Sequence, residues 1–162
     1  MKKILDSGDR TEFETGAVRD MREGKGRCDL LPLGVVSKVY QHNEGIRRIF
    51  KCLDDFQNYG DVDDLYEVIL TYIIHHNGHC YSTLFLEVAK HFEEGAKKYG
   101  ENNWQKGIPV RCYIDSAVRH FLKWIRDDQD EPHDRAFCWN ILCAIWTCEN
   151  KPELNDYRKD DE

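Results

Sequence analysis

Histidine and carboxylate side chains recur at helical spacing in the segment 82–99, whose apolar residues follow the pattern of a single helix. On the side opposite the apolar arc lie His91, Glu94 and Lys98. An imidazole and a carboxylate three residues apart can face one cation, and hard ions such as Mg²⁺ prefer the oxygen ligand. We interpret Glu94 as a candidate metal ligand that His91 orients. The alternative is a solvated face on which Glu94 and Lys98 form an ion pair.

The segment 133–149 is apolar on nearly every side, which predicts a helix that is buried nearly all round. Asn140 lies on it, seven residues after His133 and therefore on the same face. Burying an amide without partners costs about 1–3 kcal/mol, so we expect Asn140 to be hydrogen-bonded. Its partner is either a ligand, for which small residues nearby leave space, or a residue of a neighbouring helix.

Acidic residues crowd the turn 127–134 that precedes this helix, and Asp130 is among them. Such carboxylates repel one another unless water or a cation neutralises them. An acidic first turn is also favoured by the helix dipole alone. On the preceding helix, His120 lies at the edge of the apolar arc and Arg119 lies on another side. Taken singly, these two fit a core-edge histidine and an exposed ion pair.

Three consecutive helices thus carry carboxylates, histidines, an amide and basic side chains. Helices that pack together would bring such groups to one pocket. The sequence lacks a nucleophile elbow, a Walker loop and a GxGxxG loop, which argues against covalent catalysis and dinucleotide binding. The basic, glycine-containing stretch 24–27 makes Arg27 a possible phosphate clamp. We interpret the polar residues as a site for a nucleotide.

The elements that must position these groups are helical. We expect a first helix to begin at Asp29, with Pro32 in its first turn, and Gly100 to end the fourth helix. Hydrophobic periodicity and capping residues predict the remaining helices over residues 44–58, 62–77, 82–99, 115–126 and 133–149. The predicted fold class is all-α.

The chain divides into three parts. Residues 1–28 lack periodicity and form an extended N-terminal arm, residues 29–150 form the helical domain, and residues 151–162 form a charged tail. Within the helical domain, residues 36–80 are interpreted as an inserted helical pair, and residues 83–150 as the helices that carry the polar site.

Net charge, apolar runs and cysteine spacing limit the partners and the location that we expect for the protein. The formal net charge of −7 disfavours nonspecific binding to nucleic acid or to an anionic membrane surface. No apolar run approaches the roughly 20 residues of a membrane span, and no signal-peptide pattern is present, so we expect a cytoplasmic protein. The seven cysteines are odd in number and follow neither a zinc spacing nor a disulfide framework. We interpret them as reduced thiols.

A series of motifs resembles the phage and prophage dATP/dGTP diphosphohydrolase-like family. The resemblance covers about residues 13–35 and 83–150. The motifs that carry it are Gly16-Ala17-Val18-Arg19-Asp20, Gly24-Lys25-Gly26-Arg27, Asp29-Leu30-Leu31-Pro32, Phe92-Glu93-Glu94-Gly95-Ala96-Lys97-Lys98-Tyr99-Gly100, Asn103-Trp104, Asp115-Ser116-Ala117-Val118-Arg119-His120, Asp130-Glu131 with His133, and Trp139-Asn140.

The resemblance implies a MazG-like helical bundle that hydrolyses purine deoxynucleoside triphosphates to the monophosphate and pyrophosphate with Mg²⁺ or Mn²⁺. It also implies a homo-oligomer, because MazG-like bundles are completed by assembly. The implied catalytic residues are Glu94, His120, Asp130 and His133. The implied metal ligands or their direct neighbours are Glu87, His91, Glu94, Asp130 and His133. The implied substrate-binding residues are Arg27, Lys98, Asn103, Trp104, Arg119 and Asn140.

One departure from the family pattern keeps an alternative open. MazG-like enzymes usually carry Glu-x-x-Glu and Glu-x-x-Asp pairs, whereas this chain has His91-x-x-Glu94 and Asp130-x-x-His133. The thinner carboxylate set favours a non-catalytic protein of phage origin that captures a nucleotide or a cyclic-nucleotide signal. A purely structural helical protein is the third reading.

Overall fold

The computed structural model describes residues 8–159 and is built mainly of α-helices, which confirms the predicted fold class. The arrangement is consistent with a MazG-like helical fold. The helices are α1 (Leu33–Val39), α2 (Glu44–Tyr59), α3 (Val62–His76), α4 (Tyr81–Tyr99), α5 (Val110–Ile125) and α6 (His133–Asn150). Short 3₁₀ turns cover Cys28–Leu30, Asn103–Lys106 and Pro152–Leu154.

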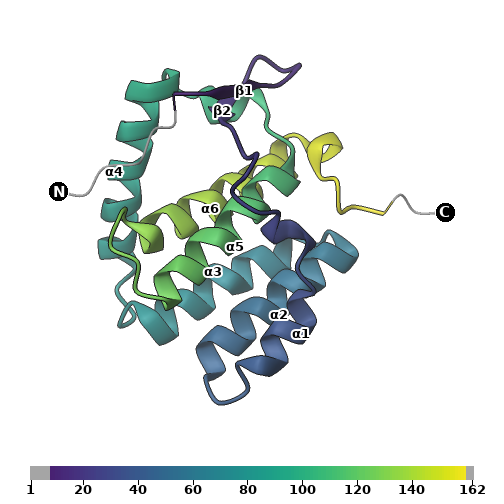
Figure 1. Cartoon of the computed structure of the whole chain (residues 1–162), viewed down its shortest axis with the longest axis vertical. Helices are drawn as coiled ribbons and strands as arrows, with labels where there is room; N and C mark the ends of the chain where they lie inside the picture. The colour runs from purple at the N-terminus through teal and green to yellow at the C-terminus, as the bar shows by residue number, and fades with distance from the viewer. Residues whose placement is uncertain (1–7, 160–162) are drawn as a thin grey trace.

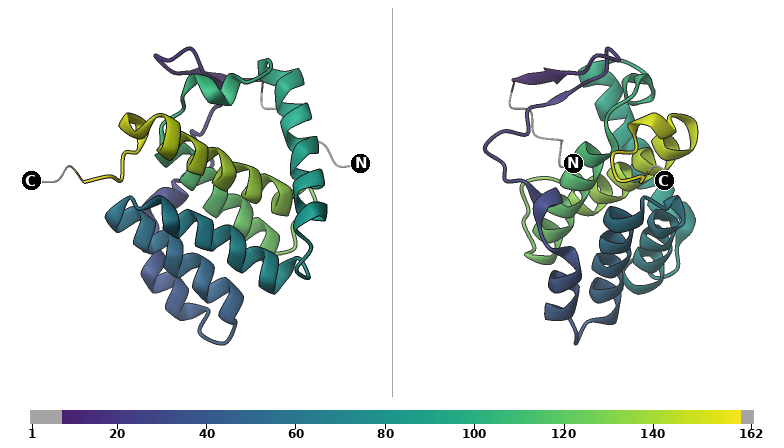
Figure 2. Two further views of the ribbon diagram at one scale, coloured as in Figure 1. Left: turned by 180° about the vertical axis from the view of Figure 1, so that it is seen from behind. Right: turned by 90° about the vertical axis from the view of Figure 1, so that its right-hand side faces the viewer.

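Helices α5 and α6 pack against each other at the centre of the molecule (Figure 1). Helices α1, α2 and α3 form a layer on one side of this pair, and α4 runs across one end of it (Figure 2). Phe121 on α5 joins the layers, because its ring lies 5.3 Å from that of Phe50 and 4.7 Å from that of Phe137. Among residues 8–159, no helix is both long and apolar enough to cross a membrane.

The turn between α2 and α3 shows how local sequence sets the helix ends. Gly60 ends α2 in the left-handed conformation, with φ of 69°, and its N–H donates to the carbonyl of Phe56. The next residue, Asp61, caps α3 by accepting a hydrogen bond from the N–H of Asp63. The two predicted helices of the segment 36–80 therefore form a tight antiparallel pair, and α3 packs directly on α6.

Two helix starts differ from the sequence prediction. Helix α5 begins at Val110 rather than near Asp115, because Pro109 ends the extended loop and its carbonyl already accepts from Cys112. The first α-helix begins at Leu33, after Pro32, and a 3₁₀ turn precedes it. Asp29 does not cap that helix, since its buried carboxylate pairs with Arg27 instead.

Part of the N-terminal arm folds as a β-hairpin that periodicity did not predict. Strands β1 (Arg10–Glu12) and β2 (Val18–Asp20) are antiparallel, with Thr11 opposite Arg19. Three-residue strands contain too little alternation to be recognised in a sequence. The hairpin and the loop after it cross the open side between α4 and α5 (Figure 1). Residues 1–7 of the predicted arm and 160–162 of the predicted tail lie outside the described residues.

Candidate functional site

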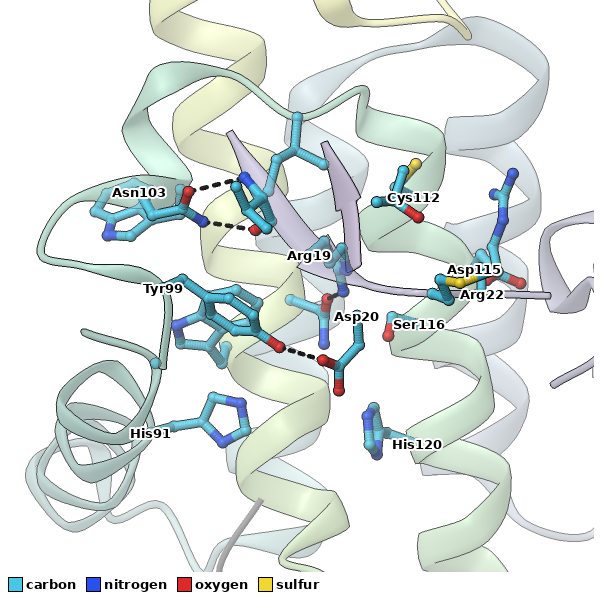
Figure 3. A pocket seen from close by; sticks show the side chains of 18 of the residues that line it. Arg19, Asp20, Arg22, His91, Tyr99, Asn103, Cys112, Asp115, Ser116 and His120 are labelled. Carbon is cyan, nitrogen blue, oxygen red and sulfur yellow. Dashed lines mark hydrogen bonds between the residues drawn. The ribbon is translucent and has the colours of Figure 1, made fainter. Parts of the chain in front are cut away.

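A cavity of about 1180 Å³ lies between the N-terminal hairpin and helices α4, α5 and α6. Figure 3 shows its interior, with His91 and His120 on opposite walls and Asp20 reaching in between them. Its roof is the segment from Val18 to Arg27, which is brought over the helices from the far end of the chain. The cavity is large enough for a nucleotide, since ligand pockets usually measure about 300–1,000 Å³.

The hairpin is fastened to the helical core by Asn103. Its side-chain carbonyl accepts from the N–H of Val18 at 2.8 Å, and its amide donates to the carbonyl of Val18 at 2.7 Å. Trp104 beside it packs between the rings of Phe92, at 5.3 Å, and Trp146, at 5.0 Å. Both Asn103 and Trp104 line the cavity.

Arg19 extends from β2 to the middle of α6. Its Nη2 donates to Oδ1 of Asn140 at 2.5 Å, and its guanidinium lies 5.0 Å from the ring centre of Tyr113 and 5.9 Å from that of Trp139. Asn140 is 2% exposed and also donates to the carbonyl of Ala136, which confirms that its amide is hydrogen-bonded. The Nη1 of Arg19 is buried without a hydrogen-bond partner among the described residues. A cationic donor group is therefore available at the cavity.

A second cluster of polar and charged side chains surrounds Asp20 beneath the hairpin. Its carboxylate accepts from Tyr99 at 2.8 Å and pairs with Arg10 at 2.7 Å and with Lys98 at 3.3 Å. Burial, followed by the bond to Asp20, raises the pKa of Tyr99 well above its ordinary value. Lys98, a predicted substrate-binding residue, thus lies beside the cavity and contacts the hairpin.

Of the predicted metal ligands on α4, His91 is the one that points inward and lines the cavity. His91 is buried against Trp139, with ring centres 5.2 Å apart, and its Nδ1 has no partner among the described residues. Burial, and then the positive charges of Arg135, Arg19 and Lys98, together lower the pKa of His91 to about 3. His91 is therefore a neutral imidazole at pH 7.

The two acidic residues predicted on this face of α4, Glu87 and Glu94, have different surroundings from His91. Glu94 pairs with Arg135 of α6 at 2.9 Å. Arg135 is only 4% exposed, so this is a buried ion pair. Glu87 pairs with Lys90 on the half-exposed outer part of the helix. Neither Glu87 nor Glu94 lines the cavity.

Two histidines meet where α5 and α6 come together. The Nδ1 atoms of His120 and His133 are 2.9 Å apart, and Nε2 of His133 is 2.6 Å from Oδ1 of Asp130. Glu131 Oε1 lies 3.8 Å from both Nδ1 atoms. Burial and the neighbouring His133 lower the pKa of His120 well below its ordinary value. The bond from His133, and then that from Lys123, lowers the pKa of Asp130.

The predicted phosphate-binding residues Arg27 and Arg119 hold the cavity roof in place. Arg119 pairs with Asp115 at 2.5 Å and donates to the carbonyls of Lys25 and Gly26. Arg27 forms a two-bond pair with Asp29, at 2.7 Å and 2.6 Å. Both arginines line the cavity, so their positive charges also favour an anionic ligand there.

The structure brings most of the predicted residues to one region. Those that line the cavity are Arg27, His91, Asn103, Trp104, Arg119, His120 and Asn140. Lys98, Asp130 and His133 lie directly behind its wall, bonded to lining residues or to their neighbours. Sequence reasoning missed Arg19, Asp20, Glu131 and Arg135 as separate site residues. The first two lie in an arm without periodicity, and only the family motif containing them could have drawn attention to them.

The arrangement of donor atoms bears on which metal the site could hold. Two groups of side chains in residues 8–159 present three ligand atoms within 4.8 Å of one another: His120, Glu131 and His133, and Asp128, Asp130 and His133. Each group contains at least one imidazole, and no group made of carboxylates alone occurs in that part of the chain. These donors fit a divalent cation, but a less hard one than Mg²⁺, which prefers oxygen ligands.

Comparison with known proteins confirms the resemblance seen in the motifs. Residues 79–157 match the model of the family described as "dATP/dGTP diphosphohydrolase, N-terminal". A dATP/dGTP diphosphohydrolase of Salmonella phage PMBT28 is 34% identical over 77 residues, which cover 44% of this chain and 26% of that protein. The match therefore spans about a quarter of the relative's length. No solved structure matches this chain.

Proposed function

We propose that this chain, whose residues 79–157 match the dATP/dGTP diphosphohydrolase N-terminal family, hydrolyses purine deoxynucleoside triphosphates to monophosphate and pyrophosphate. The observation that carries the proposal is the cavity itself. Its lining combines cationic groups, such as Arg19 and Arg119, with the imidazole of His120 and the carboxylate of Glu131. A triphosphate needs both, because its charge must be balanced and its attacking water must be activated.

The division of roles follows from the positions of the side chains. Arg19, with its unpartnered Nη1, and Arg119 would bind phosphate oxygens. His120, Glu131 and His133 would hold the divalent cation, Mg²⁺ or Mn²⁺ in the prediction from the resemblance. Such a cation, when bound, neutralises phosphate charge and lowers the pKa of a water molecule. The site for the base would be the aromatic wall that includes Trp139.

The reaction can be tested by incubating the protein with each of the four dNTPs and Mg²⁺ or Mn²⁺. Chromatography then measures dNMP, and a coupled assay measures pyrophosphate. We expect dATP and dGTP to give equal amounts of dNMP and pyrophosphate, with much slower release from dCTP and dTTP. Absence of dNMP from every dNTP with either cation contradicts the proposal.

A second function, capture of a nucleotide without turnover, is favoured by one observation. The acidic residues Glu94 and Asp20 are already paired with Arg135 and with Arg10 and Lys98. Isothermal titration distinguishes the two functions. Tight binding of a nucleotide that is recovered unchanged after long incubation with the cation supports capture, whereas recovery as monophosphate supports hydrolysis.

We also propose that the chain forms a homo-oligomer. An exposed apolar row on α3, spaced by four residues, consists of Tyr66, Leu70 and Ile74, and the first turns of α4 add Phe85 and Leu86. Sedimentation measures the mass in solution. We expect a dimer or higher assembly that dissociates in Leu70→Glu. Leu30→Glu is the control, because Leu30 is also exposed but lies outside this row, and the assembly should stay intact. A monomer at all concentrations contradicts this part of the proposal.

A further inference from the structure

Three ligand atoms converge at the junction of α5 and α6. They are Nδ1 of His120, Nδ1 of His133 and Oε1 of Glu131, with separations of 2.9 Å between the nitrogens and 3.8 Å from each nitrogen to the oxygen. The side chains are 15%, 1% and 11% exposed, respectively. Ligand atoms of a tetrahedral ion with bonds of 2.0–2.1 Å are separated by roughly 3.3 Å. The observed separations lie on both sides of that value.

The hydrogen bonding around His133 prepares its Nδ1 to be a ligand. Its Nε2 lies 2.6 Å from a carboxylate oxygen of Asp130, so Nε2 carries the hydrogen and donates it. The lone pair of a neutral His133 is then on Nδ1, which faces His120 and Glu131. Asp130 is held in turn by Lys123 at 3.2 Å. A carboxylate that orients a histidine in this way is the usual partner of a metal-ligating imidazole.

We propose that His120, His133 and Glu131 form a site for a divalent first-row transition ion, such as Zn²⁺, Co²⁺ or Mn²⁺, with Asp130 as its positioning residue. Two imidazole nitrogens and one carboxylate oxygen suit these ions better than Mg²⁺. The inference assigns the cation of the proposed function and rests on that function only for what the ion does there. Binding of the ion is measured without any nucleotide.

The site opens toward the cavity on one side only. His120 and Glu131 line the cavity, whereas His133 is buried behind them. Three protein ligands leave at least one coordination position for water or for a phosphate oxygen, which is the arrangement of catalytic rather than structural zinc sites. The open position would face the space between His120 and Asp20 (Figure 3).

A competing group shares His133 but differs in its other members, Asp128 and Asp130. Asp128 already forms an ion pair with Arg126 at 2.5 Å, and Asp130 is 41% exposed. In that group His133 would use Nε2, the nitrogen that bonds Asp130 in this structure. The two sites therefore predict different effects of substitution, since only the proposed one requires His120 and only the competing one requires Asp128.

The test uses the full chain, freed of metal with EDTA and then titrated with Zn²⁺, Co²⁺ or Mg²⁺ by calorimetry. Cys80 is an exposed thiol that can bind Zn²⁺ or Co²⁺ by itself, so Cys80→Ser serves as the background. We expect one equivalent of Zn²⁺ or Co²⁺ per chain, bound at least 100-fold more tightly than Mg²⁺, and a Co²⁺ absorption spectrum of low coordination number. Equal affinity for Mg²⁺ and Zn²⁺, or no bound ion, overturns the inference.

Variants locate the ion. His120→Ala and Glu131→Gln should each weaken Co²⁺ binding by 10-fold or more, and Asp130→Asn should weaken it by about 10-fold to 100-fold. Asp128→Asn is the matched control and should bind as the background does. Loss of binding in Asp128→Asn with retention in His120→Ala overturns the inference in favour of the competing group. Glu131→Gln keeps the shape of the side chain, so it decides the outcome if His120→Ala does not fold.

The results separate the two proposals. A tightly bound transition ion without hydrolysis of any dNTP removes the proposed function and leaves the metal site standing. Hydrolysis by a protein that binds none of these transition ions tightly removes the metal site and leaves the function standing.

Discussion

Arg19 and Asn140 are 121 residues apart in the chain, yet the guanidinium of the first donates a 2.5 Å hydrogen bond to the amide oxygen of the second. The bond joins the hairpin over the cavity to the most deeply buried helix of the fold. It gives the buried amide of Asn140 its partner and holds a positive charge against Tyr113. The same hydrogen bond therefore contributes to the stability of the helical core and to the position of the Arg19 charge at the cavity.

Asn140→Ala should reduce both properties. The substitution leaves the half-buried Arg19 without its amide partner, so the free energy of unfolding should fall by about 1–3 kcal/mol. Affinity for dATP should fall as well, because the guanidinium loses its fixed position. Asn150→Ala is a close control, since Asn150 makes the same bond to the carbonyl four residues earlier but is exposed. Urea unfolding and calorimetry measure both effects, and equal behaviour of the two variants contradicts the expectation.

Glu94→Gln separates a catalytic role from a structural one. The variant removes the charge that balances the buried Arg135 but keeps an oxygen that can accept its hydrogen bond. We expect a loss of stability of about 1–3 kcal/mol together with loss of turnover. Glu93→Gln is the control, because Glu93 is exposed and pairs with the exposed Lys97 rather than with a buried arginine. An unchanged rate in a destabilised Glu94→Gln would leave the residue a structural role alone.

Stability should depend on pH through His91. Its pKa is lowered to about 3 in the folded chain, whereas an exposed histidine takes up its proton near pH 6.5. The unfolded chain therefore binds more protons between these values, so this contribution to stability is present above pH 6.5 and is lost as the pH falls toward 3. The slope is at most about 1.4 kcal/mol per pH unit for one group.

Urea unfolding of the metal-free protein at pH 7 and pH 5 measures this dependence. His91→Asn should show a smaller fall in stability between the two values than the parent chain. His120 and His76, whose pKa values are lowered in the same direction, contribute to the part that remains. His42→Asn, at an exposed position, should keep the parent slope. A parent-like slope in His91→Asn contradicts the assignment.

Two glycines should respond in opposite ways to alanine. At Gly60, with φ of 69°, a Cβ would lie 2.6 Å from the backbone nitrogen of Arg158, so Gly60→Ala should lower the melting temperature by several degrees. At Gly95, inside α4, a Cβ meets nothing within 4 Å. Gly95→Ala should therefore stabilise the chain by about 0.5–1 kcal/mol. Thermal unfolding followed by circular dichroism tests both, and a stabilised Gly60→Ala would contradict the tight docking of the tail.

The sequence predicted the helices well because their apolar periods are long and their caps are explicit, as at Asp61. It predicted the hydrogen-bonded state of Asn140 from burial alone. It did not predict which residue supplies the bond, since Arg19 lies in a strand of three residues. The inward face of α4 was also hard to foresee, because Leu84, Val88 and His91 form the buried row and one member is polar. Pairings such as that of Glu94 with Arg135 depend on how two helices cross, which spacing along one helix does not encode.

The hydrogen bond between Arg19 and Asn140 has a consequence for how the protein matures. A ribosome adds about 5–20 residues per second, so the hairpin emerges roughly 6–24 seconds before the helix that must receive it. During that interval Arg19 lacks its partner Asn140, and the wall of the cavity that α6 supplies is missing. The cavity can therefore bind a ligand only after α6 has been synthesised. A chain released before α6 would carry the roof segment without the capacity to bind, and nucleotide-dependent protection from proteolysis would report only chains that contain α6.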